Sequence, residues 1–319
     1  MHFTRYHNAI QIIMKKILIT GSNGLIGQKL VERFLPEKEY EIIASSFSEN
    51  VHQLKEGYQF ELMDITNPVE VDYILNRYEP EVVIHTAAAT QVALCETQQL
   101  EAWKTNVEAT GILAKSSEKF GSQFILLSSD FVFDGRNGPY SEEGKTQPVN
   151  YYGKTKLESE KIAAKISKNL AIIRTCLVYG TNFTMKRSNF LLWVKYCLEK
   201  NGHIRVNNDQ WRTPTLAEDI AEACLSIVRK EAKGIFHIAG PENMRVLDLA
   251  YTIADFYKLD KDLITEVPSE ELEEIGTRPL KSGLLINKAA AELDYRPHII
   301  KEGLKIVTKQ LKSMESTDD

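Results

Sequence analysis

The chain has 319 residues, 43% hydrophobic and 26% charged, which is typical of a globular protein of one large or two modest domains and argues against extensive disorder. Its net charge is −5, and Lys and Arg are interleaved with the acids, so we expect neither a nucleic-acid partner nor a membrane surface. No apolar run approaches the roughly 20 residues that a membrane span needs.

The N-terminal segment lacks the pattern of a targeting signal. Residues 1–11 are polar, and the short apolar run that follows ends at Met14, Lys15 and Lys16. We therefore expect no signal peptide, a cytoplasmic location, and flexible tails at residues 1–13 and 313–319. A strand pattern begins directly after Met14, which makes Met14 a candidate for the native first residue. The four cysteines have no CxxC or metal-ligand spacing, as expected in a reducing compartment.

Short apolar runs and helical patterns alternate along the first half of the chain. Strands are predicted at residues 16–20, 40–45, 58–62, 81–85, 123–127 and 170–174. Helices are predicted between them at residues 25–35, 68–78, 98–120 and 151–167. Strands separated by helices form parallel βαβ units, so the pattern predicts an α/β fold with a doubly wound Rossmann sheet.

The rhythm changes after about residue 179. Helical patterns at residues 190–200, 216–230 and 246–257 alternate with short strand-like pieces such as residues 234–238. We interpret residues 15–180 as an NAD(P)-binding Rossmann domain that carries the catalytic groups. Residues 181–312 are then a smaller α+β lobe that binds substrate, with some segments crossing between the lobes.

A glycine-rich loop, TGSNGLIG at residues 20–27, joins the first predicted strand to the first predicted helix. Glycine permits the tight turn and lets the backbone approach a pyrophosphate, while the helix N-terminus offers free N–H groups to the phosphates. The loop predicts a dinucleotide site. The residues expected to contact the dinucleotide here are Gly21, Ser22, Asn23, Gly24, Leu25, Ile26 and Gly27.

The end of the second predicted strand bears on the choice between NAD and NADP. Residues 43–48 contain no carboxylate and no Arg, and the first acid is Glu49. Repulsion of a 2′-phosphate is therefore weak, and the hydroxyl of Ser45 or Ser46 can reach it. We expect NADPH, with NADH as the alternative. Asp64 could flank the adenine or cap the next helix. Further cofactor contacts are expected from Asp64, Ile65, Ala87, Ala88 and Ala89, which follow the third and fourth strands.

Three side chains predict carbonyl reduction. Tyr152 and Lys156 lie four residues apart at the start of a predicted helix, which places them on one face. Hydride addition to a carbonyl leaves an alkoxide that needs a proton, and a nearby ammonium lowers the pKa of a phenol from about 10. Lys156 can also bind the nicotinamide ribose. Ser129 ends the fifth strand, where open α/β sheets bind ligands, and its hydroxyl can polarise the carbonyl.

These motifs resemble the extended short-chain dehydrogenase/reductase family, and within it the dTDP-4-dehydrorhamnose reductase subgroup of dTDP-L-rhamnose biosynthesis. The resemblance covers residues 16–304. It is carried by TGSNGLIG, SSDFVFDG (128–135), YYGKTKLESEK (151–161), RTCLVYG (174–180), DQWRTPT (209–215) and RPLKSGL (278–284). It implies NADPH-dependent reduction of the 4-keto group of a dTDP-6-deoxyhexulose, with Tyr152 as proton donor, Lys156 tuning it and Ser129 holding the carbonyl.

The resemblance also implies supporting residues. Asn106, in TNVEAT, matches an asparagine that supports the proton relay of such enzymes. Asn189, Gln210, Arg212 and Arg278 are candidate contacts to the nucleotide sugar; an Arg can clamp a pyrophosphate with two hydrogen bonds. For Arg212 and Arg278 the alternative interpretation is a surface salt bridge. The family usually has Tyr where this chain has Phe131, Thr where it has Ser129, and a Gly within the segment that holds Arg212.

Two alternatives remain open from the sequence. The same resemblance extends to the beta subunit of methionine adenosyltransferase, an NADP-binding regulatory partner, although a pure binder has no need of a tuned proton donor. The chain could also reduce another nucleotide sugar. Dimers are common in the family, so a homodimer is a candidate. We read His85 and His237 as packed side chains and expect no protein-built metal site.

Overall fold

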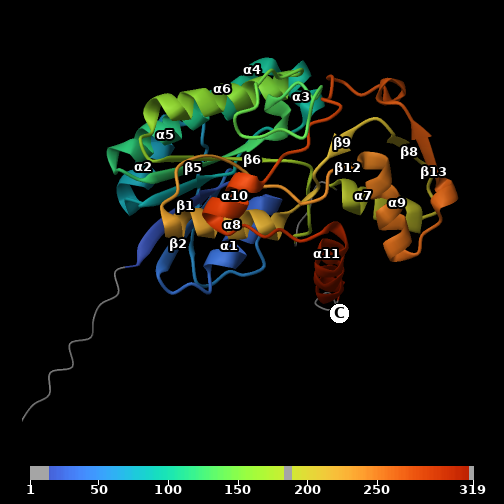
Figure 1. The fold of residues 1–319 in the computed structure, drawn as a ribbon. Helices are drawn as coiled ribbons and strands as arrows, with labels where there is room; N and C mark the ends of the chain where they lie inside the picture. The colour runs from blue at the N-terminus through green and yellow to red at the C-terminus, as the bar shows by residue number, and fades with distance from the viewer. Residues whose placement is uncertain (1–13, 183–188, 316–319) are drawn as a thin grey trace, which may run out of the picture.

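The computed structural model describes residues 14–182 and 189–315. Its centre is a seven-stranded sheet in the order β3-β2-β1-β4-β5-β6-β11, with every neighbouring pair parallel (Figure 1). The strands are β1 (Lys15–Thr20), β2 (Tyr40–Ser46), β3 (Gln59–Leu62), β4 (Val82–His85), β5 (Gln123–Ser129), β6 (Leu170–Thr175) and β11 (Gly234–His237). The strand order reverses between β1 and β4, and such a reversal opens a ligand crevice at the carboxyl ends.

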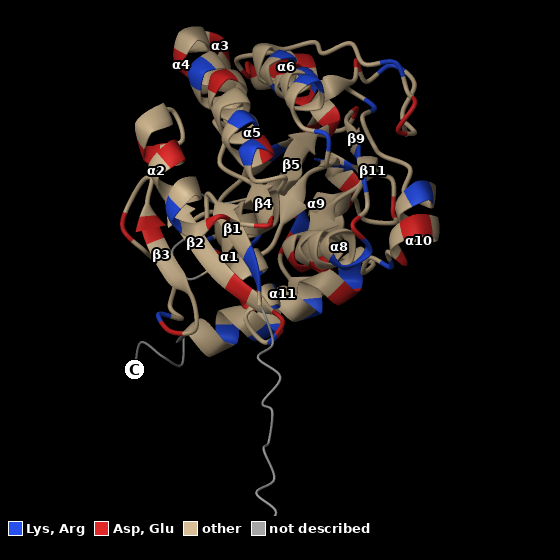
Figure 2. Cartoon of the chain, turned by 90° about the vertical axis from the view of Figure 1, so that its left-hand side faces the viewer, with Lys and Arg blue, Asp and Glu red and all other residues tan. Residues whose placement is uncertain are grey.

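Helices cover both faces of this sheet. Figure 2 shows α2, α5 and α6 on one side and α1 and α8 on the other. Ile17 and Ile19 pack in the core beneath α1 and α8, whereas Leu18 packs in the core beneath α2 and α5. Because successive side chains of a strand point to opposite faces, a strand covered on both faces must be apolar throughout. The helices are α1 (Leu25–Phe34), α2 (Pro68–Tyr78), α5 (Ala109–Lys119), α6 (Tyr151–Ile166), α8 (Ala217–Lys230) and α10 (Asn287–Leu293).

A second hydrophobic core lies beyond the carboxyl ends of the large sheet. It is built from α7 (Phe190–Glu199), α9 (Val246–Tyr257), α11 (Ile300–Glu315) and three two-stranded pieces. The pieces pair β7 (Val178–Tyr179) with β10 (Thr215–Leu216), β9 (Trp211–Arg212) with β12 (Met244–Arg245), and β8 (Ile204–Asn207) with β13 (Ile264–Val267). Short 3₁₀ segments η2 (Asp130–Val132), η3 (Lys261–Leu263) and η4 (Ser269–Leu272) complete the described elements.

The predicted doubly wound α/β class is confirmed, with three local differences. The strand near residue 234 pairs with β6 in the large sheet rather than belonging to the smaller lobe. The helix predicted at residues 98–120 is divided into α4 (Gln99–Trp103), a π-helical turn η1 (Lys104–Glu108) and α5, and α3 (Val92–Thr97) precedes it. Ser313, expected in a flexible tail, lies in α11. No helix of residues 14–182 and 189–315 is long and apolar enough to cross a membrane.

Candidate functional site

A cavity of about 710 Å³ opens at the carboxyl ends of β1 and β4. Eleven of its lining residues are ones that the sequence predicted, namely Gly21, Gly24, Leu25, Ile26, Gly27, Ser45, Ser46, Asp64, Ile65, Ala87 and Ala88. Five predicted contacts, Ser22, Asn23, Ala89, Tyr152 and Lys156, do not line it. The cavity occupies the crevice where this strand order binds nucleotides.

The glycine loop is shaped for close backbone approach. Gly21 has a φ of +72°, and a Cβ there would lie 2.7 Å from the backbone nitrogen of Ala87. A Cβ on Gly27 would lie 2.3 Å from the carbonyl oxygen of Gly21. The buried hydroxyl oxygen of Ser22 has no hydrogen-bond partner within the described part of the chain. These features fit a dinucleotide whose pyrophosphate would meet the loop and the N-terminus of α1.

We expect Gly27→Ala to weaken NADPH binding at least ~10-fold, or about 1.4 kcal/mol. The added methyl would also lie 2.6 Å from the Cα of Ser22, and backbone atoms cannot move aside without distorting the loop. Quenching of protein fluorescence by NADPH measures the affinity. Gly121→Ala is the control. Its positive φ of +66° costs about 1 kcal/mol of stability, but no atom within 4 Å meets its Cβ, so affinity stays at the wild-type value. An unchanged affinity in Gly27→Ala contradicts this use of the loop.

Two of the predicted cofactor contacts, Ser45 and Asn23, form hydrogen bonds within the protein. The Ser45 hydroxyl is fully buried and donates to the carbonyl of Ile19, so Ser46 and Phe47 form the cavity wall that a 2′-phosphate could reach. The Asn23 amide donates to Ser48 and Glu49 and thereby holds the loop after β2.

Asp64 lines the cavity and also accepts hydrogen bonds from the backbone and hydroxyl of Thr66, both at 2.8 Å. The cap of α2 is Asn67, which accepts from Val69, so Asp64 is not the cap residue. The sequence did not predict the cavity wall formed by Glu101, Lys104 and Thr105. A continuous helical pattern gave no sign of the π-helical turn that begins there.

Ser129, at the end of β5, and Tyr152, in the first turn of α6, lie close together. A hydrogen bond with Ser129 acts on the half-buried Tyr152 phenol, and the ring of Phe131 packs edge-on against it with centroids 5.8 Å apart. Asn150 begins α6 by accepting from the backbone of Gly153 at 2.7 Å, which sets where the helix presents Tyr152. Burial raises the pKa of Tyr152 above its ordinary value, and the Ser129 hydrogen bond opposes this. The lowering of this pKa that the sequence predicted from Lys156 is therefore not seen.

Lys156 is a buried ammonium in the same site. Its side chain is 5% exposed, and no hydrogen bond from it is seen among the described residues. Burial lowers the pKa of Lys156 to about 8, and the charge of Glu160 opposes the shift. A buried cation without a hydrogen-bond acceptor is costly unless a ligand or water satisfies it, which fits a role in binding the cofactor ribose.

Asn106 ties the catalytic helix to the cavity wall. It lies in the π-helical turn, 1% exposed, and its amide accepts from the Ala89 N–H at 2.8 Å and donates to the Ala89 carbonyl at 2.9 Å. It also donates to the Thr155 hydroxyl at 2.9 Å. Because the amide is engaged on both sides, the structure shows a support that fixes the loop after β4 against α6; the predicted part in a proton relay stays a prediction.

The four candidate substrate contacts lie in different settings. Asn189 begins α7 by accepting from Leu192, and it donates to Gly180. Gln210 and Arg212 are buried and hydrogen-bond to each other at 2.9 Å, so Arg212 does not form the surface salt bridge considered above. Arg278 pairs with Glu274 and lines a smaller cavity of about 430 Å³ with Asp134, Arg136 and Lys281.

Two histidines are buried among neutral partners. His85 is buried between the hydroxyls of Thr20 and Thr110, and burial lowers its pKa to about 3. His237 is also buried, and burial lowers its pKa to about 3. Across the described ranges, no group of three His, Cys, Asp or Glu residues is placed to hold a metal ion.

Comparison with known proteins gives consistent matches over almost the whole chain. The family model described as RmlD substrate binding domain matches residues 14–313. The chain is 30% identical to the dTDP-4-dehydrorhamnose reductase of Aggregatibacter actinomycetemcomitans over 310 residues, covering 92% of this chain and 98% of that one. It is also 30% identical to methionine adenosyltransferase 2 subunit beta of Rattus norvegicus over 276 residues, covering 85% of this chain and 78% of that subunit.

A solved structure agrees with these matches. The crystal structure of a dTDP-4-dehydrorhamnose reductase from Clostridium acetobutylicum superposes with a TM-score of 0.83 at 29% identity, covering 93% of this chain and 99% of that one.

Proposed function

The chain belongs to the RmlD substrate binding domain family and is an NAD(P)-dependent oxidoreductase, and on this premise we propose that it reduces the 4-keto group of a dTDP-linked 6-deoxyhexulose with NADPH. The observation that carries the proposal is the meeting of Tyr152 with Ser129, next to a buried Lys156. The reductases of similar sequence and fold support the substrate class.

The proposed reaction needs a hydride, a proton donor and groups that hold the carbonyl oxygen. When bound, the reduced nicotinamide supplies hydride to the carbonyl carbon. The Ser129 and Tyr152 hydroxyls orient the carbonyl oxygen, and Tyr152 gives its proton to the alkoxide that forms. Lys156 holds a positive charge that favours loss of this proton and binds the ribose. Asn106 keeps the wall at Ala89 in register with α6.

The nucleotide half of the substrate is proposed to lie along the second lobe. Arg278, Arg136 and Lys281 surround a cavity of about 430 Å³ with one acid, Asp134, in the wall. Arg278 pairs with Glu274 and Arg136 with Asp134, so Lys281 supplies the net positive charge. A pyrophosphate could replace a carboxylate partner, and an arginine can bind it with two hydrogen bonds. Asn189 lies beside the segment 183–188, which is outside the described residues, and it remains a candidate contact together with Gln210.

The proposed preference for NADPH rests on the wall at the end of β2, where Ser46 lines the cavity. We expect Ser46→Glu to lower kcat/KM for NADPH at least ~10-fold, because an added carboxylate repels a 2′-phosphate, and to change kcat/KM for NADH less than ~3-fold. Parallel kinetics with the two cofactors measure the ratio. Ser46→Gln, equal in size and uncharged, is the control. Equal losses with both cofactors would refute a 2′-phosphate at this wall.

Turnover of a nucleotide sugar tests the function itself. The protein is mixed with NADPH and dTDP-4-keto-6-deoxyhexose, and loss of NADPH absorbance is followed while the product sugar is identified. The relatives named methionine adenosyltransferase 2 subunit beta support a second candidate, a cofactor-binding partner of another enzyme. NADPH binding without turnover of dTDP-, UDP- or GDP-linked 4-ketohexoses would favour that candidate. Turnover of a UDP- or GDP-linked sugar alone would keep the chemistry and change the substrate.

A further inference from the structure

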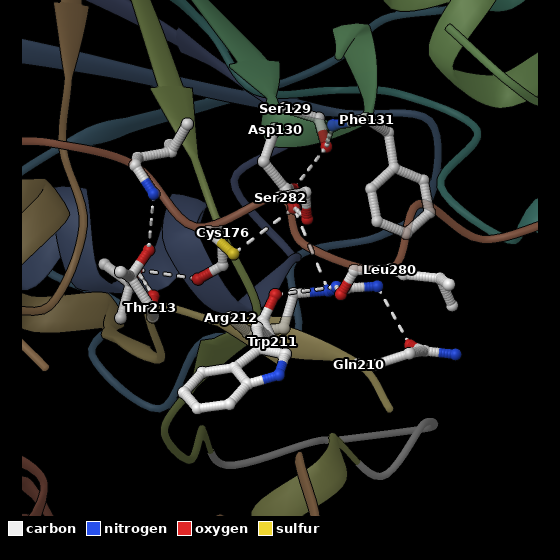
Figure 3. Close-up of polar contacts among 12 residues, drawn as sticks. Ser129, Asp130, Phe131, Cys176, Gln210, Trp211, Arg212, Thr213, Leu280 and Ser282 are labelled. Carbon is white, nitrogen blue, oxygen red and sulfur yellow. Dashed lines mark hydrogen bonds and ion pairs between the residues drawn. The ribbon is translucent and has the colours of Figure 1, made fainter. Parts of the chain in front are cut away.

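A buried carboxylate lies directly behind the catalytic serine. Asp130 is 2% exposed, and its Oδ1 accepts from the Ser129 hydroxyl at 3.1 Å. Its Oδ2 accepts from the hydroxyl of Ser282 and from the thiol of Cys176, and Figure 3 shows these groups converging on it. Ser282 comes from the second half of the chain. The proposed reaction assigns Asp130 no role, although burying a carboxylate is costly without compensation.

The compensating charge is Arg212, from strand β9. Its Nε lies 3.9 Å from Asp130 Oδ2, and both side chains are almost completely buried. The rest of the guanidinium donates to Gln210 Oε1 at 2.9 Å, the Leu280 carbonyl at 3.2 Å and the Trp211 carbonyl at 2.8 Å. These bonds hold the guanidinium in one orientation. A contact to substrate is therefore not needed to explain why an arginine is buried here.

Asp130 and Arg212 each contact a residue that packs against Tyr152. Asp130 accepts from the Ser129 hydroxyl and so fixes the serine oxygen, which itself accepts from the backbone N–H of Phe131 at 3.2 Å and faces Tyr152. A substrate carbonyl oxygen bound between Ser129 and Tyr152 would share the serine proton with Asp130. The Arg212 guanidinium also lies 5.6 Å from the centre of the Phe131 ring, the ring that packs against Tyr152.

We propose that Asp130 and Arg212 are positioning residues: Asp130 fixes the Ser129 hydroxyl, and Arg212 neutralises the Asp130 charge that would otherwise act on Tyr152. Asp130 directly follows β5 of the large sheet, whereas Arg212 lies in β9 of the second lobe. The proton donor is thus set only when both halves of the chain are in place. The inference rests on the proposed function only in that Tyr152 is the proton donor.

The test uses the opposite charges of the two residues. Asp130→Asn removes a negative charge near the phenol and leaves the Arg212 cation unpaired, so the pKa of Tyr152 falls. Arg212→Gln leaves the Asp130 carboxylate unpaired, so the pKa of Tyr152 rises. Each displacement is expected to be on the order of one pH unit, as for a charge a few ångströms away. The double variant returns close to wild type. Besides Asp130, the titratable group whose charge acts on Tyr152 is Cys95, and Lys156 lies one turn along the same helix. Both are unchanged in every variant.

Two readouts are measured on the full chain. One is the Cζ signal of 13C-labelled tyrosine, assigned to Tyr152 by its loss in Tyr152→Phe and titrated with NADP⁺ present. The other is the pH profile of kcat for oxidation of the product sugar. Arg245→Gln is the matched control, because Arg245 lies on the neighbouring strand β12 and pairs with Asp248 at the surface. Its titration is expected to match wild type.

The proposal is supported if the two single variants shift the pKa of Tyr152 in opposite directions and the double variant cancels the shift. Displacements in the same direction, or none, in folded variants overturn it. If the single variants unfold, Ser282→Ala decides: losing one donor to the carboxylate should raise the pKa of Tyr152 slightly, and an unchanged titration overturns the proposal. A wild-type protein that turns over no sugar refutes the proposed function, yet the tyrosine titration still tests the pair.

Discussion

Replacing Tyr152 by Phe is expected to lower kcat for sugar reduction roughly 10²–10⁴-fold, the range that one general acid contributes. Only the hydroxyl is removed, and the ring that packs against Phe131 stays. The Ser129 oxygen keeps its bonds to Asp130 and Phe131, so the surroundings lose little. The dissociation constant for NADPH should therefore change less than ~3-fold.

The control for this variant is the neighbouring tyrosine. Tyr151→Phe removes the same atom one residue away, on a ring covered by the Lys154 ammonium at 5.5 Å from its centre. Since the residue four positions after Tyr151 is Thr155 rather than a lysine, this phenol lacks the pairing that the chemistry needs. Stopped-flow traces of NADPH oxidation compare the two variants. Equal activity of Tyr152→Phe and wild type would rule out Tyr152 as the proton donor.

Lysine 156 should give opposite effects on activity and on stability. Lys156→Met is expected to lower kcat/KM roughly 10²-fold or more, because the charge beside the phenol is lost. At pH 7 the same variant should melt roughly 2–5 °C higher, since the fold no longer buries an ammonium. Lys154→Met, on the exposed face of α6, should change neither quantity. A destabilised Lys156→Met protein would contradict the cost assigned to this burial.

The pH dependence follows from the sign of the Lys156 shift. Its pKa of about 8 in the folded protein lies below the ordinary lysine value of 10.5, so the unfolded chain binds more protons between these values. Stability should therefore rise with pH across that window, and Lys156→Met should abolish the rise. Activity should do the reverse: reduction slows as pH passes about 8 and Lys156 loses its charge. Thermal melts and initial rates from pH 6.5 to 10 measure both.

Local sequence determined the parts of this protein whose physics is local. Short continuous apolar runs between helical patterns predicted the sheet, because strands covered on both faces must be apolar throughout. The glycine loop predicted the cavity wall at Gly21 and Gly27, since only glycine tolerates atoms that close. The spacing of Tyr152 and Lys156 fixed their common helix face, and Ser129 followed from its place at a strand end.

Tertiary structure decided what depends on meetings between distant segments. The sequence predicted Arg212 as a substrate contact, whereas its burial against Asp130, 82 positions earlier by their residue numbers, appears only in the fold. The sequence near Ser45 does not indicate which way its hydroxyl points; in the fold it donates to the Ile19 carbonyl. The π-helical turn carries Asn106, whose side chain bonds to Ala89 and Thr155, and neither partner is near it in the sequence. Propensity and spacing describe neighbours along the chain, whereas burial, ion pairing and pKa arise from neighbours in space.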